Sequence, residues 1–164
     1  MMTAYGRMLL AAAGSAALLL AAFGFQLFGG LVPCELCVWQ RWPHALAVGV
    51  GVLGITVLWR RRRVLSGLGA GLMAVSVAIA ATHVGVEQGL WASPGGCDAP
   101  APGAKSAEDL MAEIMEAPLV RCDAVAWSFL GLSMAAWNGL ASLGLGALWA
   151  ASAAWWRMPF ERDA

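Results

Sequence analysis

The chain has 164 residues, of which 60% are hydrophobic and only 12% are charged, and its formal net charge is zero. This composition lies far outside the usual range for soluble domains and excludes an ordinary soluble fold. We therefore expect an integral membrane protein, which has the lipid bilayer as its surroundings and no nucleic acid as a partner.

Four apolar stretches are candidates for membrane spans, since a helix needs about 20 residues to cross a hydrocarbon core of about 30 Å. They lie at about residues 8–32, 42–59, 64–86 and 134–156. The second opens with Pro43, which a first helical turn tolerates. A cleaved signal peptide is the alternative for the first stretch, but its apolar core exceeds the usual length of about 7 to 15 residues. We predict an all-α fold: a four-helix bundle in a single transmembrane domain.

The arginines predict how the chain is oriented. Arg60, Arg61, Arg62 and Arg63 separate the second and third stretches, and basic residues near membrane ends favour the cytoplasmic side. If all four stretches span, both termini are cytoplasmic, and the segments at about 33–41 and 87–133 lie on the outer face. Glycine and proline mark an irregular loop in the second of these segments.

Within this outer loop we expect a short amphipathic helix. Ser106 resembles an N-cap, with Asp109 three residues later as in a capping box, and the helix would end before Pro118. It would lie on the membrane surface or cover a neighbouring site. A solvated helix that packs on nothing in particular is the alternative. Within the spans, Gly67 and Gly71 at GxxxG spacing, and Gly139, Ser142 and Gly146, predict close helix packing.

All four cysteines, Cys34, Cys37, Cys97 and Cys122, lie in the two outer segments. Disulfides form and persist outside the cytoplasm. Three pairings are possible, and adjacency favours Cys34 with Cys37 and Cys97 with Cys122. A Cys-x-x-Cys pair is typically redox-active, whereas the second pair is also explained as a structural bridge contributing about 3 kcal/mol. A zinc site is a further alternative, but the wide second spacing and the oxidising compartment count against it, and we expect no metal.

Arg41 is the most informative neighbour of the first pair. It stands four residues after Cys37, so a helical turn would place its guanidinium on the same face as that sulfur and favour the thiolate. The dipole of the second span would act in the same direction. A side chain that merely reaches the lipid headgroups is the alternative for Arg41. A thiolate at a membrane edge suggests a lipid-soluble, two-electron acceptor, and quinone meets that requirement.

Four further polar residues lie near the outer ends of the spans: His44, His83, Glu87 and Gln88. They could contact a quinone or relay protons. An interface or packing role is the favoured interpretation for each of them, because polar residues are common at span ends.

At this point the motifs match a known family. Three parts of the chain closely resemble the disulfide bond formation protein B (DsbB) family of the bacterial inner membrane. They are the sequence from Pro33 to Cys37 followed by Gln40 and Arg41, the outer loop with two cysteines, and the segment Trp127 to Ala135 with Trp137 and Asn138. The resemblance covers nearly the whole chain.

The resemblance implies a thiol:quinone oxidoreductase that reoxidises a periplasmic DsbA-type oxidase. The partner would attack a Cys97–Cys122 disulfide at Cys97, and exchange, through a transient Cys34–Cys122 bridge, would pass the electrons to the first pair. Cys37 would then react with ubiquinone or menaquinone, with Arg41 holding and polarising the ring. An enzyme like vitamin K epoxide reductase is the alternative, for which a different cysteine order and span arrangement are expected.

Overall fold

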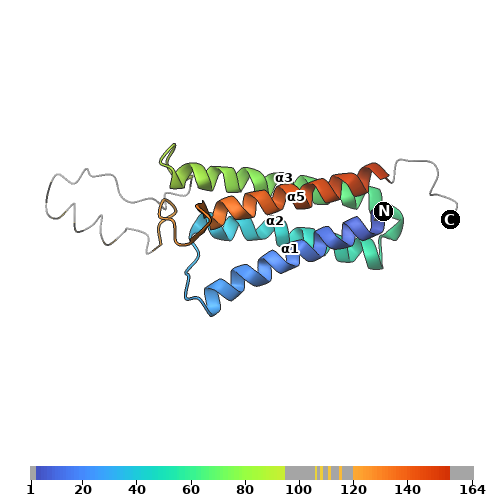
Figure 1. Cartoon of the computed structure of the whole chain (residues 1–164), viewed down its shortest axis with the longest axis horizontal. Coiled ribbons are helices and arrows are strands. Elements are labelled where there is room, and N and C mark those ends of the chain that lie inside the picture. Colours follow the sequence, from blue (N-terminus) through green and yellow to red (C-terminus); the bar gives the residue numbers. More distant parts are fainter. Residues whose placement is uncertain are drawn as a thin grey trace.

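The computed structural model describes residues 3–94, 106, 108, 111, 115 and 120–155, apart from the Trp59 side chain. The described residues form four long α-helices, which are α1 (Ala4–Leu27), α2 (Glu35–Thr56), α3 (Arg62–Glu87) and α5 (Met134–Trp155). A 3-10 turn, η1 (Trp59–Arg61), joins α2 to α3, and a short hairpin of β1 (Ser128–Phe129) and β2 (Leu132–Ser133) precedes α5. The helices run along the long axis of the molecule, and α1 diverges from the others toward its C-terminal end (Figure 1).

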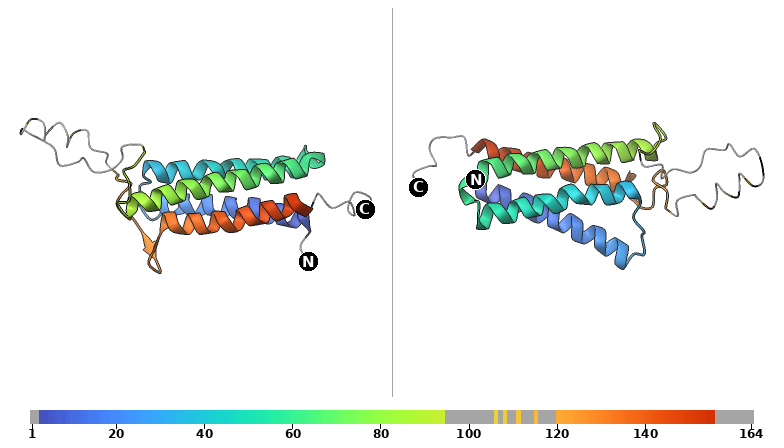
Figure 2. Two further views of the ribbon diagram at one scale, coloured as in Figure 1. Left: turned by 90° about the horizontal axis from the view of Figure 1, so that it is seen from above. Right: turned by 180° about the vertical axis from the view of Figure 1, so that it is seen from behind.

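The start of α1 and the end of α5 lie at the same end of the bundle as η1 (Figure 2). Two hydrogen bonds tie these helix ends together. Arg7 Nη1 donates to the Ala151 carbonyl at 3.4 Å, and the Ser152 hydroxyl donates to the Ala4 carbonyl at 2.9 Å. The opposite end of the bundle therefore carries the connection from α1 to α2 and the hairpin.

Small residues line the interface between α3 and α5. From one end to the other, the contacts pair Ala80 with Gly139, Ser76 with Ser142, Met73 with Gly146, Gly69 with Trp149 and Ser66 with Ser152. Since lipid is as apolar as a helix surface, close van der Waals contact and hydrogen bonds between hydroxyls hold such helices together. The predicted close packing at Gly139, Ser142 and Gly146 is confirmed.

The prediction for Gly67 and Gly71 is wrong. A Cβ at either position would meet no described atom within 4 Å, whereas a Cβ at Gly69 would overlap the Trp149 indole. The GxxxG pair lies on a face of α3 that turns away from its neighbours. Close approach depends instead on the glycine between the two.

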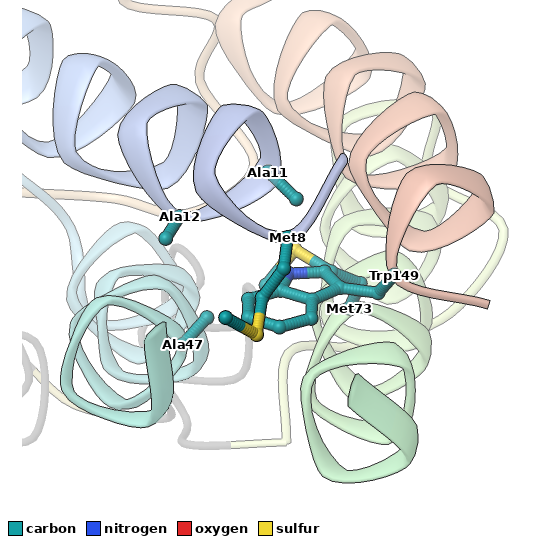
Figure 3. Close-up of a cluster of buried hydrophobic side chains, with 6 residues drawn as sticks. All are labelled: Met8, Ala11, Ala12, Ala47, Met73 and Trp149. Carbon is teal, nitrogen blue, oxygen red and sulfur yellow. The ribbon is translucent and has the colours of Figure 1, made fainter. Parts of the chain in front are cut away.

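The core next to this interface is small and tightly filled. It contains Met8, Ala11, Ala12, Ala47, Met73 and Trp149, drawn from all four helices (Figure 3). A Cβ at Gly51 would lie 2.5 Å from the Ala12 Cβ, so α1 and α2 approach each other where neither has a large side chain. Alanine and glycine let the backbones come close, and the large Trp149 and methionine side chains fill the remaining space.

The outer surface of the bundle is apolar. Each helix carries a large apolar side chain that is more than half exposed: Leu20, Val52, Leu68 and Leu143. The interior, by contrast, holds five fully buried serines: Ser15, Ser66, Ser76, Ser142 and Ser152. Of the described helices, α1 and α3 are long and apolar enough by composition to cross a membrane. An apolar exterior around a partly polar interior is the arrangement expected in lipid.

Three helices begin earlier than the sequence predicted, α3 by two residues and α1 and α2 by more. The helix expected over residues 8–32 is α1, which covers Ala4–Leu27. It begins at Ala4 because the Thr3 hydroxyl caps its first turn by accepting from the Gly6 amide at 3.1 Å. The one expected over 42–59 is α2, which begins at Glu35. Pro43 therefore lies inside α2, and its placement in a first turn is wrong.

The hairpin before α5 was not predicted. Its two turn residues, Leu130 and Gly131, have φ of 51° and 78°, as the turn of a two-residue hairpin requires. The amphipathic helix expected from Ser106 falls in a stretch of which only four isolated residues belong to the described part of the chain. That prediction stays untested.

Candidate redox site

The site is built on the first turn of α2. Cys34 is the N-cap of this helix, and its sulfur accepts a hydrogen bond from the Cys37 amide at 3.3 Å. A sulfur at the N-cap occupies the position where an anion satisfies free backbone N–H groups and the helix dipole favours negative charge. The helix starts here, ahead of the apolar run, because Cys34 caps it. The Cys-x-x-Cys motif is thus part of a helix end.

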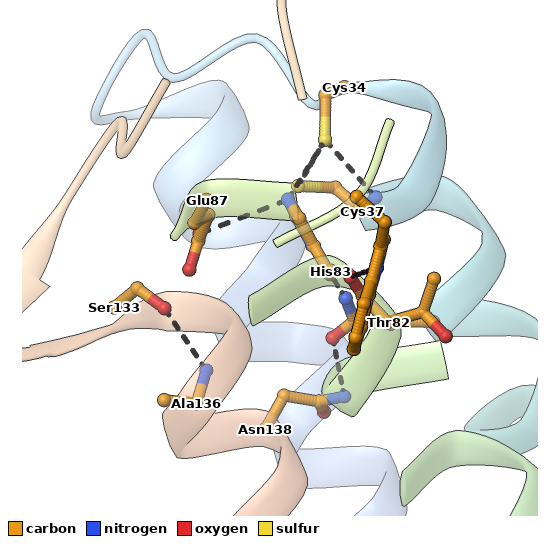
Figure 4. Close-up of polar contacts among 10 residues, drawn as sticks. Cys34, Cys37, Thr82, His83, Glu87, Ser133, Ala136 and Asn138 are labelled. Atoms are coloured by element: carbon orange, nitrogen blue, oxygen red, sulfur yellow. Dashed lines mark hydrogen bonds and ion pairs between the residues drawn. The ribbon is translucent and has the colours of Figure 1, made fainter. Parts of the chain in front are cut away.

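The two sulfurs of this motif face each other at 2.9 Å, and among the described cysteines both are free thiols. Cys34 is buried, and Cys37 is half-buried. The Cys34 sulfur also lies 3.6 Å from His83 Nε2, on α3 (Figure 4). Glu87, one turn further along α3, places a carboxylate oxygen 3.8 Å from the same ring nitrogen. The geometry therefore brings a dithiol, an imidazole and a carboxylate together.

The environment favours the thiolate at Cys34. Hydrogen bonding from the Cys37 thiol lowers the pKa of Cys34 to about 4, against the cost of burial, and His83 and the Cys37 amide act in the same direction. Cys37 is correspondingly the thiol that donates. Hydrogen bonding to Cys34 and burial raise the pKa of Cys37 and outweigh Arg41, which acts in the direction that the sequence argument expected.

Contacts with α1 fix the position of Arg41. Its Nη1 donates to Gln26 Oε1 at 2.7 Å, and its guanidinium carbon lies 4.9 Å from the centre of the Phe23 ring. Arg41 does follow Cys37 by one helical turn, but α1 holds its charged end. This end remains available at the wall of the cavity described next.

A cavity of about 450 Å³ opens beside the two cysteines. Its polar lining contains Cys34, Cys37, Gln40, Arg41, His44, His83, Glu87 and Asn138, and most of the remainder is apolar. Among the described candidate site residues, all except Cys122 and Gln88 therefore line one space. Gln88 is the C-cap of α3, outside this lining.

Aromatic rings form one wall of the cavity. Phe25, Trp127, Phe129 and Trp137 follow one another with centroids 5.3, 6.1 and 6.3 Å apart. The hairpin holds this row in place, because Trp137 Nε1 donates to the Phe129 carbonyl at 3.0 Å. A mostly apolar cavity with aromatic walls and a few polar groups suits a flat, lipid-soluble ligand with hydrogen-bond acceptors.

Cys34 also packs against the segment that contains Cys122. Cys34, Leu36, Val86 and Cys122 form a buried cluster, with Cys122 fully buried. Cys122 is disulfide-bonded, and Cys97 lies outside the described residues. Because a disulfide sulfur is not a thiolate ligand, the four-cysteine zinc site considered from the sequence does not fit this arrangement. Cys34, Cys37 and His83 do have donor atoms within 4.8 Å of one another.

The sequence analysis used Gln40 and Asn138 for the family resemblance but assigned them no role in the site. Gln40 and Asn138 hydrogen-bond each other at 2.7 Å, and Gln40 reaches His83 Nδ1 at 2.8 Å. His44, for which packing was the favoured interpretation, is buried and lies 3.0 Å from Asn138 Oδ1 and 3.3 Å from Ser15 Oγ. A polar residue one helical turn from an expected site residue, such as Gln40 before His44, was the signal that could have identified this group.

Comparison with known proteins agrees with this geometry. The family model described as "Disulfide bond formation protein DsbB" matches residues 6–152. A "Disulfide bond formation protein B" from Methylococcus capsulatus (strain ATCC 33009 / NCIMB 11132 / Bath) is 34% identical over 149 residues, covering 86% of this chain and 87% of the relative. No solved structure matches the chain. With four helices and a Cys-x-x-Cys site at one end of the bundle, the chain belongs to the DsbB family of disulfide bond formation proteins.

Proposed function

We propose that this protein is a membrane thiol:quinone oxidoreductase that reoxidises a periplasmic DsbA-type dithiol oxidase. Membership of the DsbB family implies thiol oxidoreductase activity, and the finer assignment rests on the site. The observation that carries it is the position of the Cys34–Cys37 pair, which packs against a buried disulfide cysteine and also lines an apolar cavity. Electrons can enter such a pair by thiol exchange on one side and leave it on the other.

The first half of the reaction is exchange between disulfides. A thiolate of the reduced partner would attack a Cys97–Cys122 disulfide at Cys97, and its second thiol would release the partner as a disulfide. The resulting Cys122 thiolate would attack an oxidised Cys34–Cys37 pair at Cys34. Cys97 would then close on Cys122 again and leave Cys34 and Cys37 as a dithiol. The shared burial of Cys34 and Cys122 in one cluster supports this order of contacts.

The second half is oxidation of the Cys34–Cys37 dithiol. The two sulfurs would form a disulfide and deliver two electrons to a bound quinone, with one proton from the Cys37 thiol and a second proton from solvent. Cys37 lies on the cavity wall and holds the proton, whereas Cys34 has the lowered pKa. Arg41 presents a permanent positive charge at the same wall, where it would hold and polarise a carbonyl oxygen of the acceptor. The aromatic row would stack on the ring.

The size and position of the cavity suit a quinone. Its volume of about 450 Å³ lies within the range of roughly 300–1,000 Å³ common for small-molecule sites. The site lies at the end of a bundle whose outer surface is apolar, so an acceptor dissolved in the lipid can reach it. Ubiquinone and menaquinone both satisfy these requirements.

We also propose the bacterial inner membrane as the location, with both chain termini and the arginine turn around η1 in the cytoplasm. Arg60 to Arg63 support this orientation through the bias of basic residues toward the cytoplasmic side. The cysteine end of the bundle then faces the periplasm, where disulfides persist.

The test uses purified protein in detergent, mixed with a reduced DsbA-type protein and a soluble short-chain ubiquinone. Loss of quinone absorbance follows the reaction. We expect turnover with the wild type and none with Cys37→Ser or Cys34→Ser, since neither variant can form the disulfide. Thr82→Ser serves as the matched control: it lies next to His83 on α3, but its hydroxyl bonds the Ala78 carbonyl within its own helix. Dithiol-dependent quinone reduction that survives Cys37→Ser would refute the proposal.

A further inference from the structure

A continuous row of polar side chains, all buried except the half-buried Asn138, runs from Cys34 into the interior of the bundle. It draws on all four long helices and consists of Cys34, His83, Gln40, Asn138, His44 and Ser15. Cys34 Sγ lies 3.6 Å from His83 Nε2, and His83 Nδ1 lies 2.8 Å from Gln40 Nε2. Figure 4 shows the upper part of this row, from Cys34 through His83 toward Asn138.

The Gln40 amide determines which nitrogen of His83 carries the proton. Its oxygen accepts from Asn138 Nδ2 at 2.7 Å, so its NH₂ group points to His83 Nδ1. An NH₂ group can only donate, and the ring nitrogen opposite it must therefore be an acceptor. A neutral His83 then carries its proton on Nε2, the nitrogen that faces the Cys34 sulfur.

The same reasoning extends to the far end of the row. Asn138 donates to Gln40 with its NH₂ group, and its oxygen accepts from His44 Nε2 at 3.0 Å. His44 is then protonated on Nε2 and accepts at Nδ1 from the Ser15 hydroxyl, 3.3 Å away. The second N–H of Asn138 points toward Ser76 Oγ at 3.4 Å. Every donor along the row thus points toward Cys34.

The hydrogen bonds along the row can reverse their direction only together. Turning both amides around would place a proton on His83 Nδ1 and leave Nε2 as an acceptor. That arrangement suits a Cys34 thiol, which donates, and leaves a Cys34 thiolate without this donor. One amide cannot turn without the other, because two oxygens or two NH₂ groups would then face each other between Gln40 and Asn138.

We propose that Gln40, Asn138 and His44 are positioning residues, whose directional hydrogen-bond chain holds His83 as a donor to the Cys34 thiolate. The inference rests on the proposed role of Cys34 as the thiolate of the redox pair. It assigns a function to polar groups that otherwise cost free energy inside a membrane bundle. The three residues act through His83 and do not themselves contact the reacting sulfurs.

Other charged groups around His83 and Cys34 act on the same proton. Glu87 Oε1 lies 3.8 Å from His83 Nε2, and the Cys37 thiol contacts Cys34 directly. Arg41 and Arg121 line the cavity beside them. The contacts of Glu87 with His83 and of Cys37 with Cys34 do not involve Asn138, so changes at Asn138 leave them in place.

The first test reads the ring protons directly. The chain has only two histidines, so ¹⁵N histidine labelling gives two spin systems, and His44→Asn assigns them. In the reduced protein near pH 7, long-range ¹H–¹⁵N correlation should show His83 protonated on Nε2 with Nδ1 bare. In Asn138→Leu the Gln40 amide is free to turn, and His83 should become a mixture of tautomers. A wild-type His83 with its proton on Nδ1 would overturn the proposal.

The second test is the pH profile of Cys34 alkylation by iodoacetamide in the reduced protein, followed peptide by peptide. Losing the orientation of one charged hydrogen bond should raise the midpoint by about one pH unit in Asn138→Leu. Ser66→Ala removes a buried contact at the other end of the same bundle and should leave the midpoint unchanged.

If Asn138→Leu does not fold, the isosteric Asn138→Asp takes its place in both tests. It keeps the oxygen that accepts from His44 and removes the NH₂ group that donates to Gln40. Wild-type midpoints in the folded variants would refute the positioning role. Neither readout involves quinone, so this failure is distinct from a failure of the proposed oxidoreductase activity.

Discussion

Replacing Gly69 by alanine is expected to separate α3 from α5. A Cβ built at Gly69 meets Trp149 at Cδ2, Cε2 and Cε3, the fused centre of the indole, at distances that real atoms do not adopt. Trp149 is fully buried among Met8, Ala11 and Met73, so the indole has no open space into which it can move. The helices must shift apart or the indole must leave its position.

The magnitude follows from two opposing effects. Overpacking in a filled core costs about 1–3 kcal/mol. Alanine is favoured over glycine in a helix by about 0.5–1 kcal/mol, and by less where the unfolded state in detergent keeps its helices. Because the contact falls on the rigid centre of the ring, the first effect dominates, and we expect a net loss of about 1–2 kcal/mol of unfolding free energy.

Gly67→Ala is the matched control, since it makes the same chemical change on the same helix where no described atom lies within 4 Å. It should be neutral or stabilising by up to about 1 kcal/mol. The assay is equilibrium unfolding in mixed detergent micelles, titrated with SDS and followed by tryptophan fluorescence and circular dichroism. Equal stability of the two variants would refute the packing argument, because only the contact with Trp149 distinguishes them.

Two further predictions concern the redox site. The pKa of Cys34 in the folded protein, about 4, lies below its ordinary value of 9.0, so the stability contributed by the thiolate is complete above pH 9 and is lost as the pH falls through 4. The unfolding free energy of the reduced protein, measured between pH 8 and pH 4, should show this decline. An equal dependence of the unfolding free energy on pH in Cys34→Ser would contradict it. Removing the Arg41 charge, as in Arg41→Met, should raise the KM for quinone about tenfold or more, because a charge-assisted hydrogen bond is lost. Disulfide exchange with the partner should not become slower. An unchanged KM would show that Arg41 only stabilises the α1–α2 contact through Gln26.

Much of the fold could be predicted because membrane helices have strong local signals. Long apolar runs gave the four helices, and the comparison with the DsbB family agrees with this fold class. The position of Cys34, Cys37 and Arg41 at the start of the second apolar run gave a candidate site at one end of the bundle. The structure places them around one cavity with His44, His83 and Glu87, and their roles remain proposals.

The features that could not be predicted depend on contacts in the folded protein, which local sequence patterns do not indicate. GxxxG spacing marks a smooth face on α3, but which face meets α5 depends on the rotation of the helix, and Gly69 rather than Gly67 and Gly71 faces Trp149. The start of α2 depends on a cysteine acting as N-cap, a position for which serine, threonine, aspartate and asparagine are the usual signals. The hairpin depends on positive φ at Leu130, a residue that rarely adopts it.

The helical start at Cys34 gives a physical reason for the Cys-x-x-Cys spacing in this chain. Residues three apart at a helix N-terminus bring their sulfurs together, here to 2.9 Å, while their surroundings remain different. Cys34 is the N-cap, and the Cys37 amide, His83 and the buried cluster with Cys122 surround its sulfur. Cys37 sits one turn inside the helix, on the cavity wall one turn before Arg41. A longer spacing would separate the sulfurs, and a pair outside the helix would lose the N-cap amide that distinguishes the two thiols. Under the proposed function, the same turn of α2 would meet the exchange partner at Cys34 and the lipid-soluble oxidant at Cys37.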